Sequence, residues 1–119
     1  MQHMSKQKRK LMKSNFISAC EKFNSADKMD LFIRQELKNH CPIVEKIPND
    51  NDHQLVTFIY HGIDLESVNL YSPLIGIFPI KMMRLSSSNY FYYSLVVSVN
   101  IRATWTSRHG HAKTYGYEI

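Results

Sequence analysis

The feature that most restricts the fold of this chain is a set of short strand-type runs in its second half, separated by clusters of turn residues. The runs 55–60 (LVTFIY) and 90–97 (YFYYSLVV) consist mainly of β-branched, aromatic and other apolar residues, which favour strands. Further short strands are expected at 67–71, 81–85 and 102–106. Short strands divided by turns are typical of an antiparallel sandwich, whereas alternating strands and helices would indicate a parallel sheet.

Turn and loop segments frame these strands. The polar run 48–52 (PNDND) predicts a loop, and the strand that follows it is too short and too apolar throughout for a surface helix. We expect that strand to lie in the core. The segment 72–79 contains two prolines and a glycine, so a loop is expected there despite its apolar side chains. A last strand at 113–117 would close a hairpin through His109-Gly110.

The first half of the chain carries a helical period instead. Apolar residues between Met12 and Phe23 recur in steps of three and four, the spacing of one helix face. A second helix is expected after Ser25, whose hydroxyl can cap it. It should end near His40, because Pro42 disfavours a helical conformation of the residue before it. The sequence therefore predicts a mainly β protein, an antiparallel β-sandwich preceded by two amphipathic helices.

Size and composition fit one soluble domain. Hydrophobic residues make up 44% of the 119 and charged residues 21%, which is ordinary for a folded domain. No apolar run approaches the roughly 18 residues needed to cross a bilayer, and no secretory signal is recognisable. We expect a cytoplasmic protein with no membrane partner. Cys20 and Cys41 form no CxxC pair and are expected to be buried thiols, a disulfide being the alternative if the chain is exported.

The net charge of +5 is concentrated at the N-terminus. Residues 1–24 carry six Lys or Arg and one Glu, while the remaining 95 residues carry nine side chains of each sign. We expect a basic, disordered arm at 1–11 and a single domain at 12–119. Such an arm can contact phosphates, but it offers no aromatic residue before Phe16 for base stacking. A solubilising terminus is therefore favoured over a nucleic-acid partner.

The motifs of common catalytic centres are missing from the sequence. The four glycines frame no GxSxG nucleophile elbow, and there is no Gly-rich phosphate loop, HExxH or CxxC. On a strand, His109 and His111 would share a face and could hold a metal with Glu118 or His53 as a third ligand. Exposed histidines in a terminal loop are the reading that we favour. We expect no catalytic residue, no metal and no cofactor.

Six segments stand in a characteristic order along the chain. They are FIRQEL at 32–37, PIVE at 42–45, DHQLVTFIY at 52–60, VNL at 68–70, RL with NYFY between 84 and 92, and RATW at 102–105. Their order and spacing resemble the amino-terminal domain of the enterochelin (enterobactin) esterases, over roughly residues 28 to 106. Three residues depart from the family pattern: Phe91 replaces a usual tryptophan, Asn89 a usual aspartate and His61 a frequent arginine.

The resemblance implies an Ig-like, early-set β-sandwich with a helical lead-in. In that family the domain precedes an α/β-hydrolase domain that hydrolyses catecholate siderophore esters and so releases iron in the cytoplasm. No hydrolase domain is present in this sequence, so esterase activity is not carried over. The expected function is a non-catalytic binding or docking module in siderophore and iron metabolism, with a catecholate siderophore or a separate hydrolase as its partner.

Four residues are the candidates for contact with an anionic aromatic ligand, because a guanidinium pairs with oxygen anions and stacks on rings. They are Arg84, Tyr92, Arg102 and Trp105. For Arg102, a strand-end ion pair with Asp64 or Glu66 is an equal alternative.

The alternative function is a protein-interaction or homodimerisation module that keeps the fold but not siderophore binding. Exchange of edge strands is one way in which such a homodimer could form. An apolar face that a missing hydrolase domain leaves uncovered would drive such association. The candidate interface residues belong to the loop 72–79: Leu74, Ile75, Ile77 and Phe78. The same loop can instead fold down as a flap over the core. A third reading is the remnant of a split or truncated gene.

Overall fold

Helices come first and strands follow, as the sequence pattern predicts. The computed structural model describes residues 13–39, 42–63, 65–73, 76, 78–100, 104–109 and 112–118, and for the last two ranges it describes the backbone. In this part of the chain the helices are α2 (Asn15–Glu21) and α3 (Ala26–Asn39). The strands are β1 (Ile43–Ile47), β2 (Asp50–His61), β3 (Asn69–Tyr71), β4 (Ile80–Lys81), β5 (Met83–Arg84), β6 (Tyr90–Ser98), β7 (Thr104–His109) and β8 (Ala112–Glu118).

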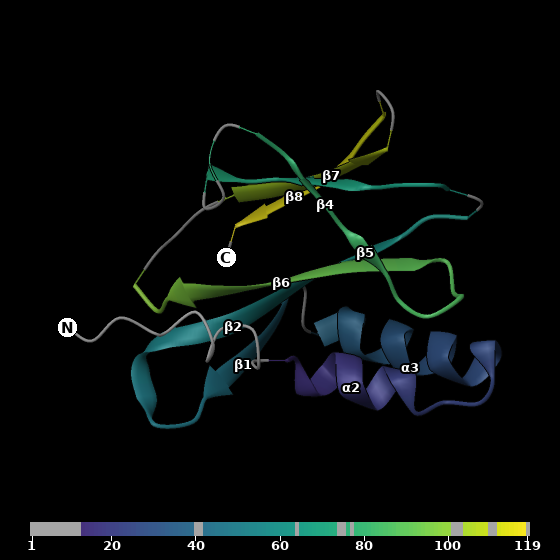
Figure 1. Cartoon of the computed structure of the whole chain (residues 1–119), viewed down its shortest axis with the longest axis horizontal. Coiled ribbons are helices and arrows are strands. Elements are labelled where there is room, and N and C mark those ends of the chain that lie inside the picture. The colour runs from purple at the N-terminus through teal and green to yellow at the C-terminus, as the bar shows by residue number, and fades with distance from the viewer. Residues whose placement is uncertain are drawn as a thin grey trace.

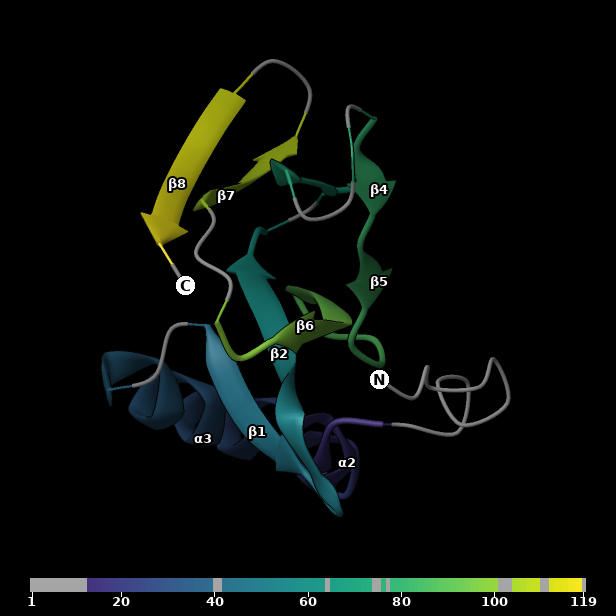
Figure 2. The same cartoon turned by 90° about the vertical axis from the view of Figure 1, so that its left-hand side faces the viewer.

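These elements form three layers (Figures 1 and 2). The helices cover one face of sheet A, whose strand order is β1-β2-β6-β5, and sheet B, ordered β4-β3-β7-β8, faces its other side. All the strand pairs are antiparallel. This arrangement confirms the expected mainly β sandwich preceded by two amphipathic helices. The basic arm 1–11 lies outside the described residues.

Strand β2 is the central strand of the core and is covered on both faces. Every side chain of its run 55–60 is buried. Val56, Phe58 and Tyr60 belong to the cluster that faces sheet B, and Ile59 belongs to the cluster under the helices. A strand with two covered faces needs an uninterrupted apolar run rather than alternation. Coverage on both faces therefore explains why the run 55–60 shows no alternation of apolar and polar residues.

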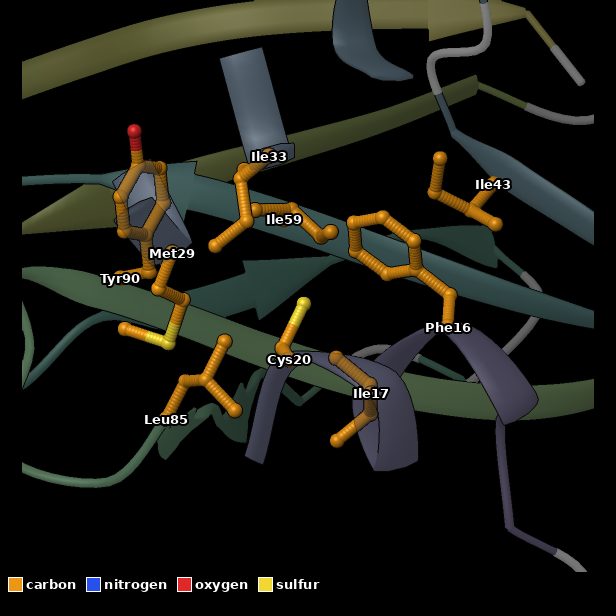
Figure 3. Close-up of a cluster of buried hydrophobic side chains, with 9 residues drawn as sticks. All are labelled: Phe16, Ile17, Cys20, Met29, Ile33, Ile43, Ile59, Leu85 and Tyr90. Carbon is orange, nitrogen blue, oxygen red and sulfur yellow. The ribbon is translucent and has the colours of Figure 1, made fainter. Parts of the chain in front are cut away.

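The helices form a layer on sheet A rather than a simple lead-in. Their buried side chains meet those of sheet A and of the turn after β5 in one hydrophobic cluster, which Figure 3 shows. Its members are Phe16, Ile17, Cys20, Met29, Ile33, Ile43, Ile59, Leu85 and Tyr90. Burial of a large apolar side chain contributes roughly 1.5–3 kcal/mol. The helix periodicity seen in the sequence is therefore the face that docks on the sheet.

Capping residues fix both helices. The N-cap of α2 is Ser14, whose Oγ accepts a hydrogen bond from the Ile17 amide at 3.2 Å. For α3, the Oγ of Ser25 accepts one from the Lys28 amide at 3.4 Å, which confirms the predicted cap. Helix α3 ends at Asn39, next to the predicted end near His40. Pro42 disfavours a helical conformation of the residue before it.

The polar run 48–52 is not a loop, and this expectation was wrong. Strand β1, which the strand-type runs did not reveal, pairs with β2 so closely that Ile47 stands opposite Asp50. Only Pro48 and Asn49 remain for the turn between them. Asn49 has a φ of 62°, a left-handed conformation that asparagine tolerates better than most residues.

The single strand expected at 81–85 is two strands in different sheets. Strand β4 lies at the edge of sheet B, and β5 lies at the edge of sheet A. Between them Met82 is buried, and its amide donates to the carbonyl of Val68 at 2.8 Å. The chain thus crosses from one sheet to the other within a residue, which keeps both edge strands short.

Candidate functional site

Arg84, one of the predicted ligand-binding residues, lies on β5 at the edge of sheet A. It stands opposite Phe91 of β6, and its guanidinium carbon lies 4.7 Å from the centroid of that buried ring. A guanidinium over an aromatic face is held by a cation–π attraction. Its Nη1 also donates to the carbonyl of Ser88 at 3.0 Å, and its Nη2 donates to the carbonyl of Leu65.

These contacts join the loop after β2 to the turn after β5. The Gly62 amide donates to the carbonyl of Asn89 at 2.9 Å, and Gly62 packs closely on Leu65. A Cβ at position 62 would lie 2.2 Å from Cδ1 of Leu65, so only glycine fits without displacement. We call the group Gly62, Leu65, Arg84, Ser88 and Phe91 the Arg84 corner.

The Arg84 corner presents a fixed cation at the surface. The residue is exposed, and no carboxylate in the described part of the chain forms an ion pair with it. A guanidinium has five N–H donors, and the two carbonyls use two of them. The remaining donors can bind an oxygen anion, and the bound carbonyls hold the planar group in place.

Tyr92 lies on the opposite face of sheet A from the Arg84 corner. It follows Phe91 directly on β6, and it packs against the cluster under the helices, whereas Phe91 belongs to the cluster facing sheet B. Successive side chains of a strand alternate between faces. The structure therefore does not bring Arg84 and Tyr92 together.

The other two ligand-binding candidates belong to sheet B or lie outside the description. The backbone of Trp105 lies in β7 and pairs with Tyr117 of β8. Arg102 lies outside the described residues, as does Asp64, a partner suggested for it. Of the four candidates, the described side chains are those of Arg84 and Tyr92, and Arg84 carries the exposed charge.

A second polar cluster, which sequence reasoning missed, links α3 to sheet A. The hydroxyl of Tyr90 donates to Asp30 Oδ1 at 2.5 Å, and Arg34 Nε lies 2.9 Å from Asp30 Oδ2. The ring of His61 stacks on that of Tyr90, with 4.5 Å between centroids. In Figure 3 the Tyr90 hydroxyl points away from the apolar cluster beneath it. We call these four residues the Tyr90 cluster.

The ionisation states of Tyr90 and Asp30 favour the hydrogen bond that joins α3 to sheet A. Burial, together with the hydrogen bond to Asp30, raises the pKa of Tyr90 to about 12. The pKa of Asp30 is lowered, chiefly by the hydrogen bond from Tyr90. Partial burial acts to raise this pKa, and Arg34 lowers it further. Near neutral pH the phenol is thus protonated and the carboxylate ionised. Asp30 and Arg34 are four residues apart on one helix, but no sequence signal joins Asp30 to Tyr90.

Cysteine and histidine are the other residue types that often carry chemistry, and the structure describes some of them. Cys20 is fully buried, as expected, and burial raises the pKa of its thiol to about 12, which makes it a poor nucleophile. Cys41 and His111 lie outside the described residues. His53 bonds through Nδ1 to the carboxylate of Asp50 at 3.0 Å. Among the described residues, no three His, Cys, Asp or Glu lie together as metal ligands would.

Of the predicted interface residues, the structure describes Phe78. Its side chain is 75% exposed, so at this position the loop does not fold down on the core. Leu74, Ile75 and Ile77 lie outside the described residues. In the part of the chain that is described, no helix is long and apolar enough to cross a membrane.

Comparison with known proteins shows a likeness of fold to solved structures of an esterase. No protein-family model and no curated protein matches the sequence. The similar solved structures include two of the enterobactin esterase FES from Shigella flexneri. The structure determined with 2,3-dihydroxy-N-benzoyl-glycine has a TM-score of 0.51 and 15% identity, and it covers 62% of this chain. The structure determined with 2,3-dihydroxy-N-benzoyl-serine has a TM-score of 0.50, 16% identity and the same coverage.

The likeness is one of fold. The chain spans about a fifth of the length of these esterase chains, 21% and 20% respectively. The sequence resemblance to the esterases and the structural likeness point to the same proteins, but at 15% identity the similarity concerns the architecture of the domain.

Proposed function

We propose that this chain is a non-catalytic binding or docking domain in the metabolism of catecholate siderophores, acting in the cytoplasm. The observation that supports the proposal most is the fold likeness to the enterobactin esterase structures, over 62% of this chain. The order of the family-like segments between 28 and 106 supports it independently. The absence of a GxSxG elbow from the sequence supports a non-catalytic role.

The Arg84 corner is the part of the described surface that suits such a ligand best. Catecholate and carboxylate oxygens are anionic, and the exposed guanidinium of Arg84 has donors to spare and no acidic partner among the described residues. Arg102 and Trp105 remain proposed contacts on sequence grounds. Tyr92, which lies on the other face of sheet A, would contact a ligand only at a separate position.

Ligand titration tests the proposal. The chain contains a single tryptophan, Trp105, whose fluorescence can be followed while 2,3-dihydroxybenzoyl-serine is added. Saturable binding is expected, and Arg84→Gln should weaken it by on the order of tenfold, which is the loss of a charge-assisted hydrogen bond. Lys46→Gln removes an exposed charge from the other edge of sheet A and should leave binding unchanged. Absence of binding by the folded wild-type chain would refute the function.

The second candidate is an interaction module that keeps the fold and binds no siderophore. The exposure of Phe78 favours it, since large apolar side chains that stand out at a surface are enriched at interfaces. A homodimer or a separate hydrolase would be the partner. The wild-type chain should then associate without binding 2,3-dihydroxybenzoyl-serine. Phe78→Ser should abolish the association, and unchanged association would exclude Phe78 as a contact.

A further inference from the structure

Strand β6 is much longer than the strand that covers its outer side. β5 pairs with it at Met83 opposite Tyr92 and at Arg84 opposite Phe91. Beyond Tyr92, no strand in the described part of the chain lies along this side of β6, which continues past the short β5 in Figure 1. We call residues 93–98 the open edge of β6.

The backbone of the open edge offers hydrogen-bonding groups outward. The Leu85 amide donates to the carbonyl of Tyr90 at 2.8 Å, so the main-chain groups of Tyr90 point away from β2. Alternate residues of a strand point their main-chain groups the same way. Ser94, Val96 and Ser98 therefore present their N–H and C=O groups outward. A row of such groups is a template for another strand.

The side chains of the open edge carry none of the usual protection against pairing. Its sequence, YSLVVS, contains no charge and no proline, and its residues favour strands. Other edge strands carry residues that disfavour pairing with a further strand. β1 has the exposed Lys46, and β4 follows Pro79 and contains Lys81. β5 is two residues long. β8, the other edge strand of sheet B, contains Lys113 and Glu118. Among the described strands, the long edge without charge or proline is thus that of β6.

We propose that a second copy of this chain pairs antiparallel along the open edge, with Val96 opposite Val96 of the partner subunit. In this register Ser94 lies opposite Ser98 of the partner subunit, so the outward-pointing residues meet as hydrogen-bonded pairs. The two copies of sheet A then form one continuous sheet, joined by on the order of six backbone hydrogen bonds. The interface is isologous, as in most homodimers.

A second copy of the chain fits the open edge because the uncharged side chains of residues 93–98 match one another across a two-fold axis. Leu95 would lie opposite Val97 of the partner subunit, and no like charges meet across the two-fold axis. A segment rich in charge, such as residues 1–11 with four Lys or Arg, would be a poorer match for this uncharged edge. The proposal does not depend on siderophore binding, since the Arg84 corner lies beyond the paired residues.

Charge exchange at the two-fold axis tests the proposal. The wild-type chain should sediment at twice 14.0 kDa. Val96→Lys or Val96→Glu alone should sediment as a monomer, because like charges would lie directly opposite, and an equimolar mixture of the two should recover the dimer. The control Val44→Lys, at a 48% exposed position on β1, should remain dimeric. Circular dichroism confirms that each variant is folded.

Three results would overturn the proposal: a monomeric wild-type chain, a dimer that Val96→Lys does not disrupt, and a mixture that stays monomeric. The last would show that another strand or another register occupies the edge. If the charged variants fail to fold, Ser98→Pro serves instead, because it removes an outward N–H and no bond to β2. It should give a folded monomer, and a folded dimer would contradict the account. A monomer that still binds 2,3-dihydroxybenzoyl-serine would leave the proposed function intact.

Discussion

Ser14 Oγ donates a 2.5 Å hydrogen bond to Glu45 Oε1, and so ties the first turn of α2 to the middle of β1. The other oxygen, Oε2, accepts from the Asn15 amide at 2.9 Å. A carboxylate at a helix N-terminus satisfies amides that have no partner within the helix, and it interacts favourably with the helix dipole. Two residues 31 apart in sequence thus fix where the helix layer begins on sheet A.

Replacement of Glu45 should therefore weaken the helix layer. Glu45→Ala leaves the buried Ser14 hydroxyl and the Asn15 amide without their acceptor, and it should lower the free energy of unfolding by about 1–2 kcal/mol. Urea denaturation measures the loss. Lys46→Ala, at the exposed neighbouring position, should change stability by less than about 0.5 kcal/mol. Equal effects of the two substitutions would argue against the cap.

Removal of the Tyr90 hydroxyl should weaken the docking of α3. Tyr90→Phe keeps the buried ring but deletes the donor to Asp30, with an expected cost of about 1–2 kcal/mol. Asp30→Asn, combined with Tyr90→Phe in a double-mutant cycle, should show coupling between the two positions. Strictly additive losses would show that the 2.5 Å contact contributes no interaction energy.

The same contact predicts how stability depends on pH. The pKa of Asp30 is lower in the folded chain than its ordinary value of 3.8, so its contribution is present above pH 3.8 and is lost as the pH falls through the folded pKa. The pKa of Tyr90 is raised from 10.0 to about 12, so its contribution is present below pH 10.0 and is lost between pH 10.0 and about 12. Unfolding measured across both ranges should show these losses in the wild-type chain and smaller ones in Tyr90→Phe.

A side chain at position 62 should disturb the Arg84 corner. In Gly62→Ala the new Cβ would lie 2.2 Å from Leu65 Cδ1 and 2.8 Å from Tyr60 Cε2, and crowding of this kind costs about 1–3 kcal/mol. Because the nearest atom ends a side chain, Leu65→Ala should restore part of the loss in the double variant. Thermal unfolding of the single and double variants checks this. A double variant no more stable than Gly62→Ala would place the strain elsewhere.

The thiol of Cys20 should be inert while the chain is folded. It is fully buried, and burial raises its pKa to about 12, so little reactive thiolate forms near neutral pH. In a Cys41→Ser background, a thiol reagent should label Cys20 only at the rate of unfolding. Rapid labelling of the native chain would contradict the packing of the cluster under the helices.

The sequence predicted elements better than it predicted contacts. The burial of α2, α3, β2 and β6 could be predicted from the sequence. Apolar residues recur at the helical period in α2 and α3, and they form the long apolar runs of β2 and β6. Strand β1 was not predicted because its sequence does not alternate: Val44 is exposed, and Glu45 lies between the buried Ile43 and Ile47.

Contacts between distant residues carried no such signal. Asp30 meets Tyr90 across 60 residues of sequence, and only the docking of α3 brings them together. Arg84 was recognised as a candidate from its residue type, but its carbonyl partners, Ser88 and Leu65, depend on how two loops close. The separation of Arg84 from Tyr92 follows from the pleat of β6, because Arg84 faces Phe91 and Tyr92 points to the other side.

Co-sedimentation with a ferric catecholate tests whether this domain binds a catecholate siderophore, as we propose. A ferric catecholate absorbs visible light and the protein does not, so the complex can be followed by its colour in the ultracentrifuge. The colour should sediment with the wild-type chain, and the folded Arg84→Gln variant should carry much less of it. If the colour stays behind with the wild-type chain at saturating concentrations, the chain is not a siderophore-binding domain.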